Sequence, residues 1–570
     1  MNGALTITTE RVDDMPLLVE QQIRMKVPQF LDEHFPQHGG RKGLSFGWLS
    51  ALWLSYILSE SNHRLSHARS WAESCLHSLK VCSGQEVRPE DFTDDRLGDI
   101  LYYLSNDDNW LAFEQSLNGN TIRTYKLESA PIRLDSTSAN GHWEVFEKGL
   151  FQFGYSKDHR PDLPQIKVKM STLDPLGMPL VTTVLPGQRA DDPEYIPAIE
   201  KVRQNFEQRG LLFVGDSKMD SLKTRAFIQK GKDYYLTPLS KKQLSHELLE
   251  DYTAPALEGT QKLETIYRTK ADGKTEEIAL AYEISEKLEL ESPKKPMVWR
   301  ERRIVVQSLG FQKQGEKTLK ERLRKATAEF NELNQRGKGR KRYPSKEELS
   351  QAVDKIAKKH RVQGLFEFNY KKKKHQRKVR EYGGKPSRIE TTSDFTVLAK
   401  VDQNAVVKSI ERMGWRVFAT NAPKKLLSIS QVVLTYRDSF MIERGFGRLK
   451  GKPLSLTPMY LQKEEHVVGL VRLLSIGLRI LTLMEFVVRR RLKEKDRELV
   501  GLYAPNPKRA TMRPTTEAIL KAFKNISLTI LKEKGSVRYH FNPLSILQQE
   551  ILLLLDFPTN LYQRFVTMPP

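Results

Sequence analysis

Cysteine is nearly absent from this sequence, and no long hydrophobic run is free of charge. The two cysteines among 570 residues, Cys75 and Cys82, lie seven positions apart, which supports neither a disulfide framework nor a zinc site. The longest apolar stretch, 466–488, carries three charged residues, and a membrane span would not normally hold them at such depths. Residues 1–20 are mixed and acidic, unlike a signal peptide. We therefore expect a cytoplasmic protein that spans no membrane.

Motifs for nucleotide cofactors and for histidine-rich metal sites are also missing. The sequence contains no Walker loop and no dinucleotide-binding fingerprint, so no nucleotide cofactor is expected. Several histidines crowd the first domain without a convincing metal-binding spacing. They are His34, His38, His63, His67 and His77.

Positive charge is what the sequence has in excess. The formal net charge is +23 and the isoelectric point is near 9.6, which predicts a polyanionic partner. Charge alone leaves nucleic acid, an acidic membrane and an acidic protein open. An apolar content of 39% is enough to form hydrophobic cores, and the length predicts roughly three to five domains.

Two carboxylates follow short apolar strands. Asp216 closes the run 211–216, which is typical of a fully buried strand, and Asp135 ends the shorter strand 131–135. A strand, a helix and a further strand between 180 and 216 form a unit of βαβ size, and ligands of such sheets gather at the carboxyl ends of strands. A single Asp at a strand end is more often a turn or cap residue than a ligand. The joint pattern favours a site.

A third carboxylate lies in an expected helix over 436–450. Tyr436, Glu443 and Lys450 are seven residues apart, nearly two helical turns, so all three side chains should share one face. The plainer interpretation is a solvated helix face with a Glu–Lys pair. Carboxylates on strand ends beside one on a helix are what two magnesium ions need for in-line attack on a phosphodiester, and in so basic a chain that phosphodiester is expected to be DNA.

Basic and aromatic residues add weaker indications of DNA binding. Seven of the ten residues in 371–380 are Lys or Arg, with Lys371, Lys372, Lys373 and Lys374 in succession. This run predicts a DNA-backbone surface, and a merely solvated charge run is the alternative. Trp415 begins the strand before the Glu443 helix; it suits either base stacking or a core position. The same basic surface is expected to include Arg336, Lys338, Arg340, Lys341 and Arg342.

The spacing of Tyr436, Glu443 and Lys450 resembles the Tyr/Arg/Glu/Lys signature of one group of bacterial insertion-sequence transposases. The segments 154–165 (GYSKDHRPDLPQ) and 214–219 (VGDSKM) resemble the sequences that this group has after its first aspartate and around its second. The similarity spans most of the chain, from the region 34–38 to the tail. These are DDE enzymes with an RNase H-like, retroviral-integrase core.

The resemblance implies a fold and a division of the chain. The fold class is α/β: an RNase H-like mixed sheet flanked by helices, interrupted by a large mixed insertion, with a helical N-terminal domain and a partly helical tail. The expected parts are a helical domain at 1–128, core segments at 129–238 and 413–490, a basic insertion at 239–412 and a basic C-terminal region at 491–570.

The resemblance also implies the roles of the site residues. Asp135, Asp216 and Glu443 would hold two Mg²⁺ or Mn²⁺ ions about 3.5–4 Å apart. Lys450 and Tyr436 would contact the backbone near the cleaved phosphate, and Trp415 would hold an unstacked base. The signature's arginine would fall at Ser439. Arg437 and Arg444 lie nearby and are expected to contact DNA, and neither occupies that position.

The function implied is that of a DNA transposase acting on nucleoid DNA in a bacterial cytoplasm. It would bind the terminal inverted repeats of its insertion sequence, cut at the ends and join them to target DNA, as a homodimer or higher synaptic assembly. An RNase H-like nuclease is the first alternative, and the large insertion before Glu443 argues against it. A catalytically silent DNA-binding protein is the second, and carboxylates at all three positions argue against that.

Overall fold

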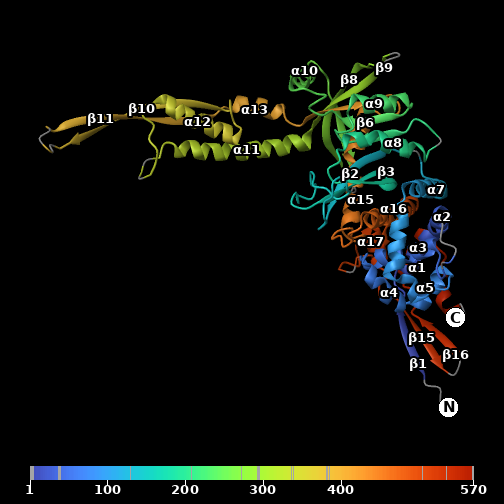
Figure 1. Ribbon diagram of the computed structural model, residues 1–570. Helices are drawn as coiled ribbons and strands as arrows, with labels where there is room; N and C mark the ends of the chain where they lie inside the picture. The colour runs from blue at the N-terminus through green and yellow to red at the C-terminus, as the bar shows by residue number, and fades with distance from the viewer. Residues whose placement is uncertain are drawn as a thin grey trace. The chain divides into compact units, whose positions relative to one another are not determined.

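The computed structural model forms two compact units (Figure 1). The first comprises 1–237, 289–297 and 435–570, and the second comprises 238–288 and 298–434. The five-part division expected from the sequence stays a prediction. The residues described are 5–35, 40, 42–128, 130–206, 208–270, 273–291, 296–335, 337, 339–380, 383, 386–503, 505–533 and 536–567; the predicted residues His38, Arg336 and Lys338 lie outside them.

The first unit contains a mixed sheet whose strands run in the order β4-β3-β2-β5-β6. Strands β2, β5 and β6 are parallel, while β3 is antiparallel to both β2 and β4. Helices α7, α8, α15 and α16 pack on this sheet, which confirms the expected RNase H-like α/β class. The strands are β2 (Ile132–Asn140), β3 (Gln165–Leu173), β4 (Met178–Pro186), β5 (Leu212–Gly215) and β6 (Tyr234–Pro238).

Two expected boundaries in this sheet were wrong. Strand β2 does not end at Asp135 but continues to Asn140, because it pairs with β3 along its whole length. Its parallel pairing with β5 stops at Leu134 opposite Gly215. The sequence favours Gly210 as the end of the helix before β5, but α8 (Tyr195–Arg203) ends at Arg203.

The N-terminal part is largely helical, as predicted, except for its first strand. Strand β1 (Thr6–Arg11) pairs antiparallel with β15 (Ser527–Glu533), which in turn pairs with β16 (Ser536–Phe541) (Figure 1). The helices are α1 (Met15–Met25), α2 (Val27–His34), α3 (Phe46–Glu60), α4 (Leu65–Glu73), α5 (Leu76–Ser83), α6 (Asp94–Leu104) and α7 (Asp107–Tyr125), with a 3-10 turn at Pro89–Phe92.

Helix α16 (Glu464–Glu494) forms the centre of the first unit. It is long and apolar enough to cross a membrane by length and composition alone, yet 94% of its apolar window is buried inside the protein, against α3, α6, α18 and β4. Its buried charges are paired: Arg479 donates to Glu114 of α7 at 2.6 Å. The elements that follow are β13 (Leu499–Val500), β14 (Ala510–Thr511), α17 (Thr516–Lys521), α18 (Ile546–Leu555) and α19 (Arg564–Thr567).

The second unit has strands in the order β12-β9-β8-β7 and a separate hairpin of β10 and β11. Helices α11, α12 and α13 pack around the base of that hairpin in one hydrophobic core. The strands are β7 (Glu264–Thr269), β8 (Thr275–Leu290), β9 (Met297–Ser308), β10 (Phe366–Val379), β11 (Arg388–Val401) and β12 (Trp415–Thr420). The helices are α10 (His246–Leu257), α11 (Leu309–Glu332), α12 (Lys346–His360) and α13 (Gln403–Glu411).

The hairpin corrects the expected lengths of two strands. The segments 365–370 (LFEFNY) and 395–399 (FTVLA) predict two short strands, but β10 and β11 each extend over 14 residues. The basic run 371–378 therefore lies inside a strand. Lysine has a low strand propensity, and only the backbone pairing with β11 reveals it.

Candidate active site

Asp135 and Asp216 lie side by side on neighbouring strands of the first unit. The parallel register pairs Leu134 with Gly215, the residues directly before the two aspartates. Gly215 is required there, because a Cβ at this position would lie 2.7 Å from the Met219 sulfur and 3.0 Å from the Met219 Cβ. The sheet thus brings together two of the three predicted carboxylates.

The Asp216 carboxylate is oriented by two donors. Its Oδ1 accepts hydrogen bonds from the Tyr195 hydroxyl at 2.6 Å and from the Lys218 backbone N–H at 3.0 Å. Tyr195 starts α8 and is 2% exposed. Burial, with the nearby charge of Asp216, raises the pKa of Tyr195 well above its ordinary value, so the phenol stays a donor.

The Asp135 carboxylate is in a less favourable electrostatic environment than a carboxylate in water. Its Oδ1 accepts from the Ser136 backbone N–H at 2.7 Å and lies 3.3 Å from the Lys157 ammonium. Burial raises the pKa of Asp135 and the charge of Asp216 adds to it, against the opposing effect of Lys157. A cation held between the two aspartates would relieve this electrostatic cost.

Lys169 and Asp191 form a second polar layer that sequence reasoning missed. The Lys169 ammonium lies 3.6 Å from the centre of the Tyr195 ring. Its burial lowers the pKa of Lys169 to about 8, against the attraction of Asp191 and other carboxylates. The Asp191 carboxylate accepts from the Ser136 hydroxyl at 2.8 Å and pairs with Lys167 at 3.0 Å and with Lys218.

The sequence contained weak indications of this layer. The sequence places Asp191 at the start of an expected helix, and the alternation in 166–172 predicts a strand that contains Lys167 and Lys169. The available pattern was a strand with two lysines that follows Asp135 along the chain, together with an Asp-Asp-Pro segment. Only the pairing of β3 with β2 brings these two lysines next to the strand that carries Asp135.

The donor set of the Asp135–Asp216 pair fits Mg²⁺ or Mn²⁺. Hard carboxylate oxygens are the ligands that these ions prefer, and burial, with a smaller effect of the Asp216 charge, raises the pKa of Asp135. Within the described part of the chain, however, no three His, Cys, Asp or Glu residues are close enough to hold one metal ion. Glu443 therefore does not form a three-carboxylate site with Asp135 and Asp216 in this structure.

The helix expected to carry Glu443 is two helices. Helix α14 (Ile429–Arg437) ends before Asp438, and α15 (Phe440–Lys450) begins after Ser439. The prediction that Tyr436, Glu443 and Lys450 share one helix face was wrong for Tyr436, which lies in α14. Glu443 and Lys450 share α15, where Glu443 is exposed.

A buried arginine of β2 binds the end of α14. Arg133 forms a two-point ion pair with Asp174, at 2.9 and 2.7 Å, and donates to the Thr435 carbonyl at 2.6 Å. Arg133 lies two residues before Asp135, so the aspartate and the segment leading to Tyr436 share one anchor.

The remaining predicted contacts of the first unit have protein partners. The Lys450 ammonium pairs with Asp158 at 2.5 Å, next to the Lys157 that faces Asp135. The Arg444 guanidinium pairs with Glu485 at 2.5 and 2.7 Å. Their roles as DNA contacts, and those of Tyr436 and Arg437, stay predictions.

The other predicted DNA contacts lie in the second unit. Trp415 is partly buried, packs beside Tyr252 and Val417, and donates its Nε1 to the Glu411 carbonyl at 2.9 Å. Either interpretation of this tryptophan remains open. The lysine run and the basic segment before α12 are exposed: Lys371, Lys372, Lys373, Lys374, Arg340, Lys341 and Arg342.

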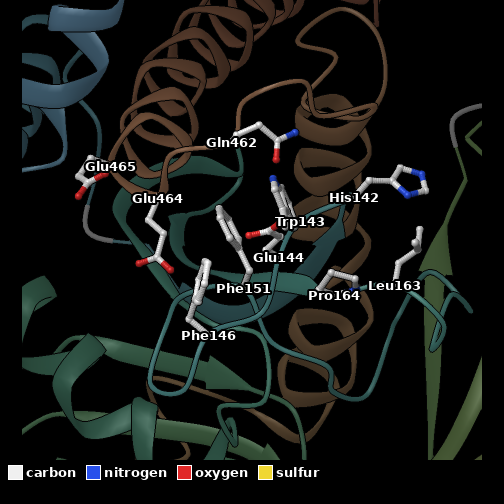
Figure 2. Close-up of a pocket in the computed structure, with 10 residues that line it drawn as sticks. All are labelled: His142, Trp143, Glu144, Phe146, Phe151, Leu163, Pro164, Gln462, Glu464 and Glu465. Atoms are coloured by element: carbon white, nitrogen blue, oxygen red, sulfur yellow. The ribbon is translucent and has the colours of Figure 1, made fainter.

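A separate pocket opens in the connection from β2 to β3 (Figure 2). Its volume is about 830 Å³, and it contains none of the predicted catalytic residues. The Trp143 and Phe151 rings stack with centroids 4.3 Å apart. Three carboxylates on its lining disfavour a phosphate there. It is lined by His142, Trp143, Glu144, Phe146, Phe151, Leu163, Pro164, Gln462, Glu464 and Glu465.

Strand order and the adjacent aspartates define the first unit as an RNase H-like core. The family model described as "Transposase DDE domain" matches residues 131–478, more than half of the 570 residues. The protein belongs to this family of DDE transposases, and its matched region contains Asp135, Asp216 and Glu443.

Comparison with other proteins adds a distant structural likeness. A cryo-EM structure of the piggyBac transposase synaptic complex with hairpin DNA is similar at a TM-score of 0.33 and 7% sequence identity, over 85% of this chain and 76% of that chain. No curated protein matches the sequence.

Proposed function

We propose that the protein binds the terminal inverted repeats of its own insertion sequence, cleaves the DNA at their ends and transfers the ends to target DNA. It would do so as a homodimer or higher assembly on bacterial nucleoid DNA. The observation that carries the proposal is the pairing of Asp135 and Asp216 at the end of the parallel β2–β5 ladder. Family membership supports the class of reaction.

Asp135 and Asp216 would supply the oxygen ligands for divalent cations, with Tyr195 and the Ser136 N–H fixing their direction. Bound Mg²⁺ or Mn²⁺ supplies Lewis-acid activation of the attacking and leaving oxygens. The proposal requires Glu443 to approach the pair when DNA and metal are present. Exposure of Glu443 on α15 leaves its carboxylate accessible for that step.

Two adjacent loop residues neutralise the site in this structure. The Lys157 ammonium faces Asp135, and the Asp158 carboxylate faces Lys450. A metal ion would replace the first cation, and a DNA phosphate would replace the second anion. Lys450 is proposed to contact the backbone near the cleaved phosphate, with Tyr436 and Arg437 close in sequence.

The test uses purified protein, Mg²⁺ and a plasmid carrying the coding segment with its flanking ends. Breaks and joined products are mapped at nucleotide resolution for wild type, Asp135→Asn and Glu443→Gln. Glu494→Gln, an exposed glutamate at the end of α16, is the matched control. Cleavage at the ends that needs Mg²⁺ and is lost in the first two variants supports the proposal.

Other outcomes separate the alternatives. Cleavage without joining to target DNA would favour an RNase H-like nuclease. Specific binding of the ends with no cleavage by wild type would favour a silent DNA-binding protein. Full activity of Glu443→Gln would show that the Glu443 carboxylate is not part of the active site.

A further inference from the structure

The hairpin of β10 and β11 extends its basic segment away from a packed base. In the base, Phe366, Phe368 and Val397 join the hydrophobic core with Phe330 of α11. Beyond it, every side chain from Lys371 to Lys378 is exposed. Within the described residues, the two strands pair only with each other, and Asp394, opposite Lys373, is buried.

The register divides the basic side chains between two faces. Successive side chains of a strand point to opposite faces, and paired residues share a face. Lys372, Lys374 and Lys378 therefore lie on one face, called here the lysine face. Their register partners are Phe395, Ser393 and Ile389, so no carboxylate lies opposite any of the three.

The opposite face has the same number of cations but is partly neutralised. It carries Lys371, Lys373 and Arg377. Asp394 is the register partner of Lys373, and its Oδ2 lies 3.7 Å from the His375 Nε2. A carboxylate beside a lysine repels a phosphate and reduces the gain from neutralising it.

Residues at the base extend the lysine face. Tyr370 has the same strand parity as Lys372, and the Lys346 ammonium of α12 lies 5.5 Å from the Tyr370 ring centre. The Lys372 ammonium lies 6.0 Å from the Phe395 ring centre. One face therefore presents a row of ammonium groups whose aliphatic stems rest beside aromatic rings, a surface suited to a continuous polyanion.

We propose that the lysine face of the β10–β11 hairpin binds the phosphate backbone of duplex DNA and that the opposite face does not. Residues i and i+2 of a strand are about 6.6–6.8 Å apart, so Lys372 and Lys374 can reach successive phosphates. The binding is sequence-independent, because phosphates carry no base information. This inference rests on the proposed function and deepens it by naming one surface that holds DNA.

The experiment compares two triple variants that remove the same charge. Lys372→Gln, Lys374→Gln and Lys378→Gln are combined in one protein; Lys371→Gln, Lys373→Gln and Arg377→Gln are combined in the other. Binding of a duplex carrying the element end, and of a scrambled duplex of equal length, is measured across a salt series. Thermal unfolding checks that the exposed substitutions leave the fold unchanged.

The lysine-face variant is expected to bind both duplexes about tenfold or more weakly. Each lost phosphate contact lowers the slope of log K against log salt by about 0.9, so its slope should fall by roughly 2–3. The opposite-face variant should change the slope by less than about 1.

Two results would overturn the face assignment. Equal losses in the two variants would show that charge alone matters, and unchanged binding in both would place the DNA elsewhere. Each of these leaves the proposed function standing, provided that wild type binds DNA. A wild-type protein that binds neither duplex would instead overturn the proposed function.

Discussion

At the scale of single residues, the two strand carboxylates are held by unlike partners. Asp216 accepts from a neutral phenol and a backbone N–H, while Asp135 faces a lysine ammonium. A neutral donor orients a carboxylate without competing for its charge, whereas an ammonium competes directly with a metal ion. The two partners should therefore affect metal use in different ways.

Removing the Tyr195 hydroxyl should weaken metal binding without unfolding the core. Tyr195→Phe keeps the ring beneath Lys169 but loses the 2.6 Å hydrogen bond to Asp216. Such a bond to a charged group contributes about 1.5–3 kcal/mol, so the Mg²⁺ needed for half-maximal cleavage should rise about tenfold. Mn²⁺ binding to DNA-free protein, followed by electron paramagnetic resonance, should weaken in parallel.

Tyr102→Phe is the control for this prediction. Tyr102 is 57% exposed on α6, so loss of its hydroxyl should change neither metal affinity nor cleavage. Metal binding by Tyr195→Phe that equals wild type would mean that the hydroxyl does not orient Asp216.

Asp158 should restrain the DNA affinity of Lys450. Asp158→Asn removes the carboxylate paired with the Lys450 ammonium and should strengthen binding of the element end by about two- to fivefold, as expected for a partly exposed pair worth up to about 1 kcal/mol. Asp162→Asn is the matched control, because Asp162 pairs instead with Arg160 in the same loop. Equal effects of the two substitutions on DNA affinity would indicate net charge rather than release of Lys450.

At the scale of elements, α15 is held to α16 by a buried charge cluster. Glu485 of α16 accepts from Arg444 and Arg448 of α15 and pairs with Arg489. Arg448 also pairs with Glu517 of α17 at 2.6 Å. The helix that carries Glu443 therefore depends on this cluster for its position.

Glu485→Gln should destabilise the first unit by about 3 kcal/mol, because it leaves the buried Arg448 guanidinium short of negative charge. The measurement is the midpoint of thermal unfolding. Glu517→Gln is the comparison: its carboxylate is 36% exposed against 7% for Glu485, so its effect should be smaller. If Glu517→Gln lowered the midpoint of thermal unfolding more than Glu485→Gln does, this result would contradict the central role of Glu485.

The same cluster predicts a pH dependence of stability. Burial would raise the pKa of Glu485, but the hydrogen bond from Arg444 and the charges of Arg448 and Arg489 outweigh it and lower the pKa. The stabilisation is therefore complete above the ordinary glutamate pKa of about 4.3 and is lost as the pH falls through the lower folded-state value. The stability difference between wild type and Glu485→Gln should shrink over that acidic range.

Element types were easier to predict than element limits. The apolar run 211–216 predicted β5, and the alternation in 166–172 and the capping pattern of Ser345 and Glu348 likewise predict β3 and α12, since these patterns depend on local spacing. The break between α14 and α15 was missed, because the residues at 438–439 tolerate a helix and no Pro or Gly marks the turn. The pairing that extends β10 depends on β11, which returns after the hairpin.

At the scale of the whole molecule, the net charge of +23 should make DNA binding strongly dependent on salt. If about 6–10 phosphates are contacted, affinity should fall by about 10³–10⁵ between 50 and 200 mM salt. Titrations of a scrambled duplex at several salt concentrations measure this slope. A flat dependence would mean that the positive charge faces something other than DNA.

The sequence by itself determined the class of the protein. The carboxylate after a buried strand and the excess of positive charge are local or compositional features, and they pointed to metal-dependent chemistry on DNA. The resemblance of the segments 154–165, 214–219 and 436–450 to insertion-sequence transposases indicated the DDE class before any fold was known.

Only the tertiary structure decided which groups meet. It placed Tyr195 on Asp216, Lys157 on Asp135, and β1 beside β15 at the far end of the chain. Such contacts join segments whose separation along the chain carries no periodic pattern, because they arise when each element buries its apolar face against another. Local spacing therefore indicated the candidate carboxylates, while the residues that orient them became visible only in the folded chain.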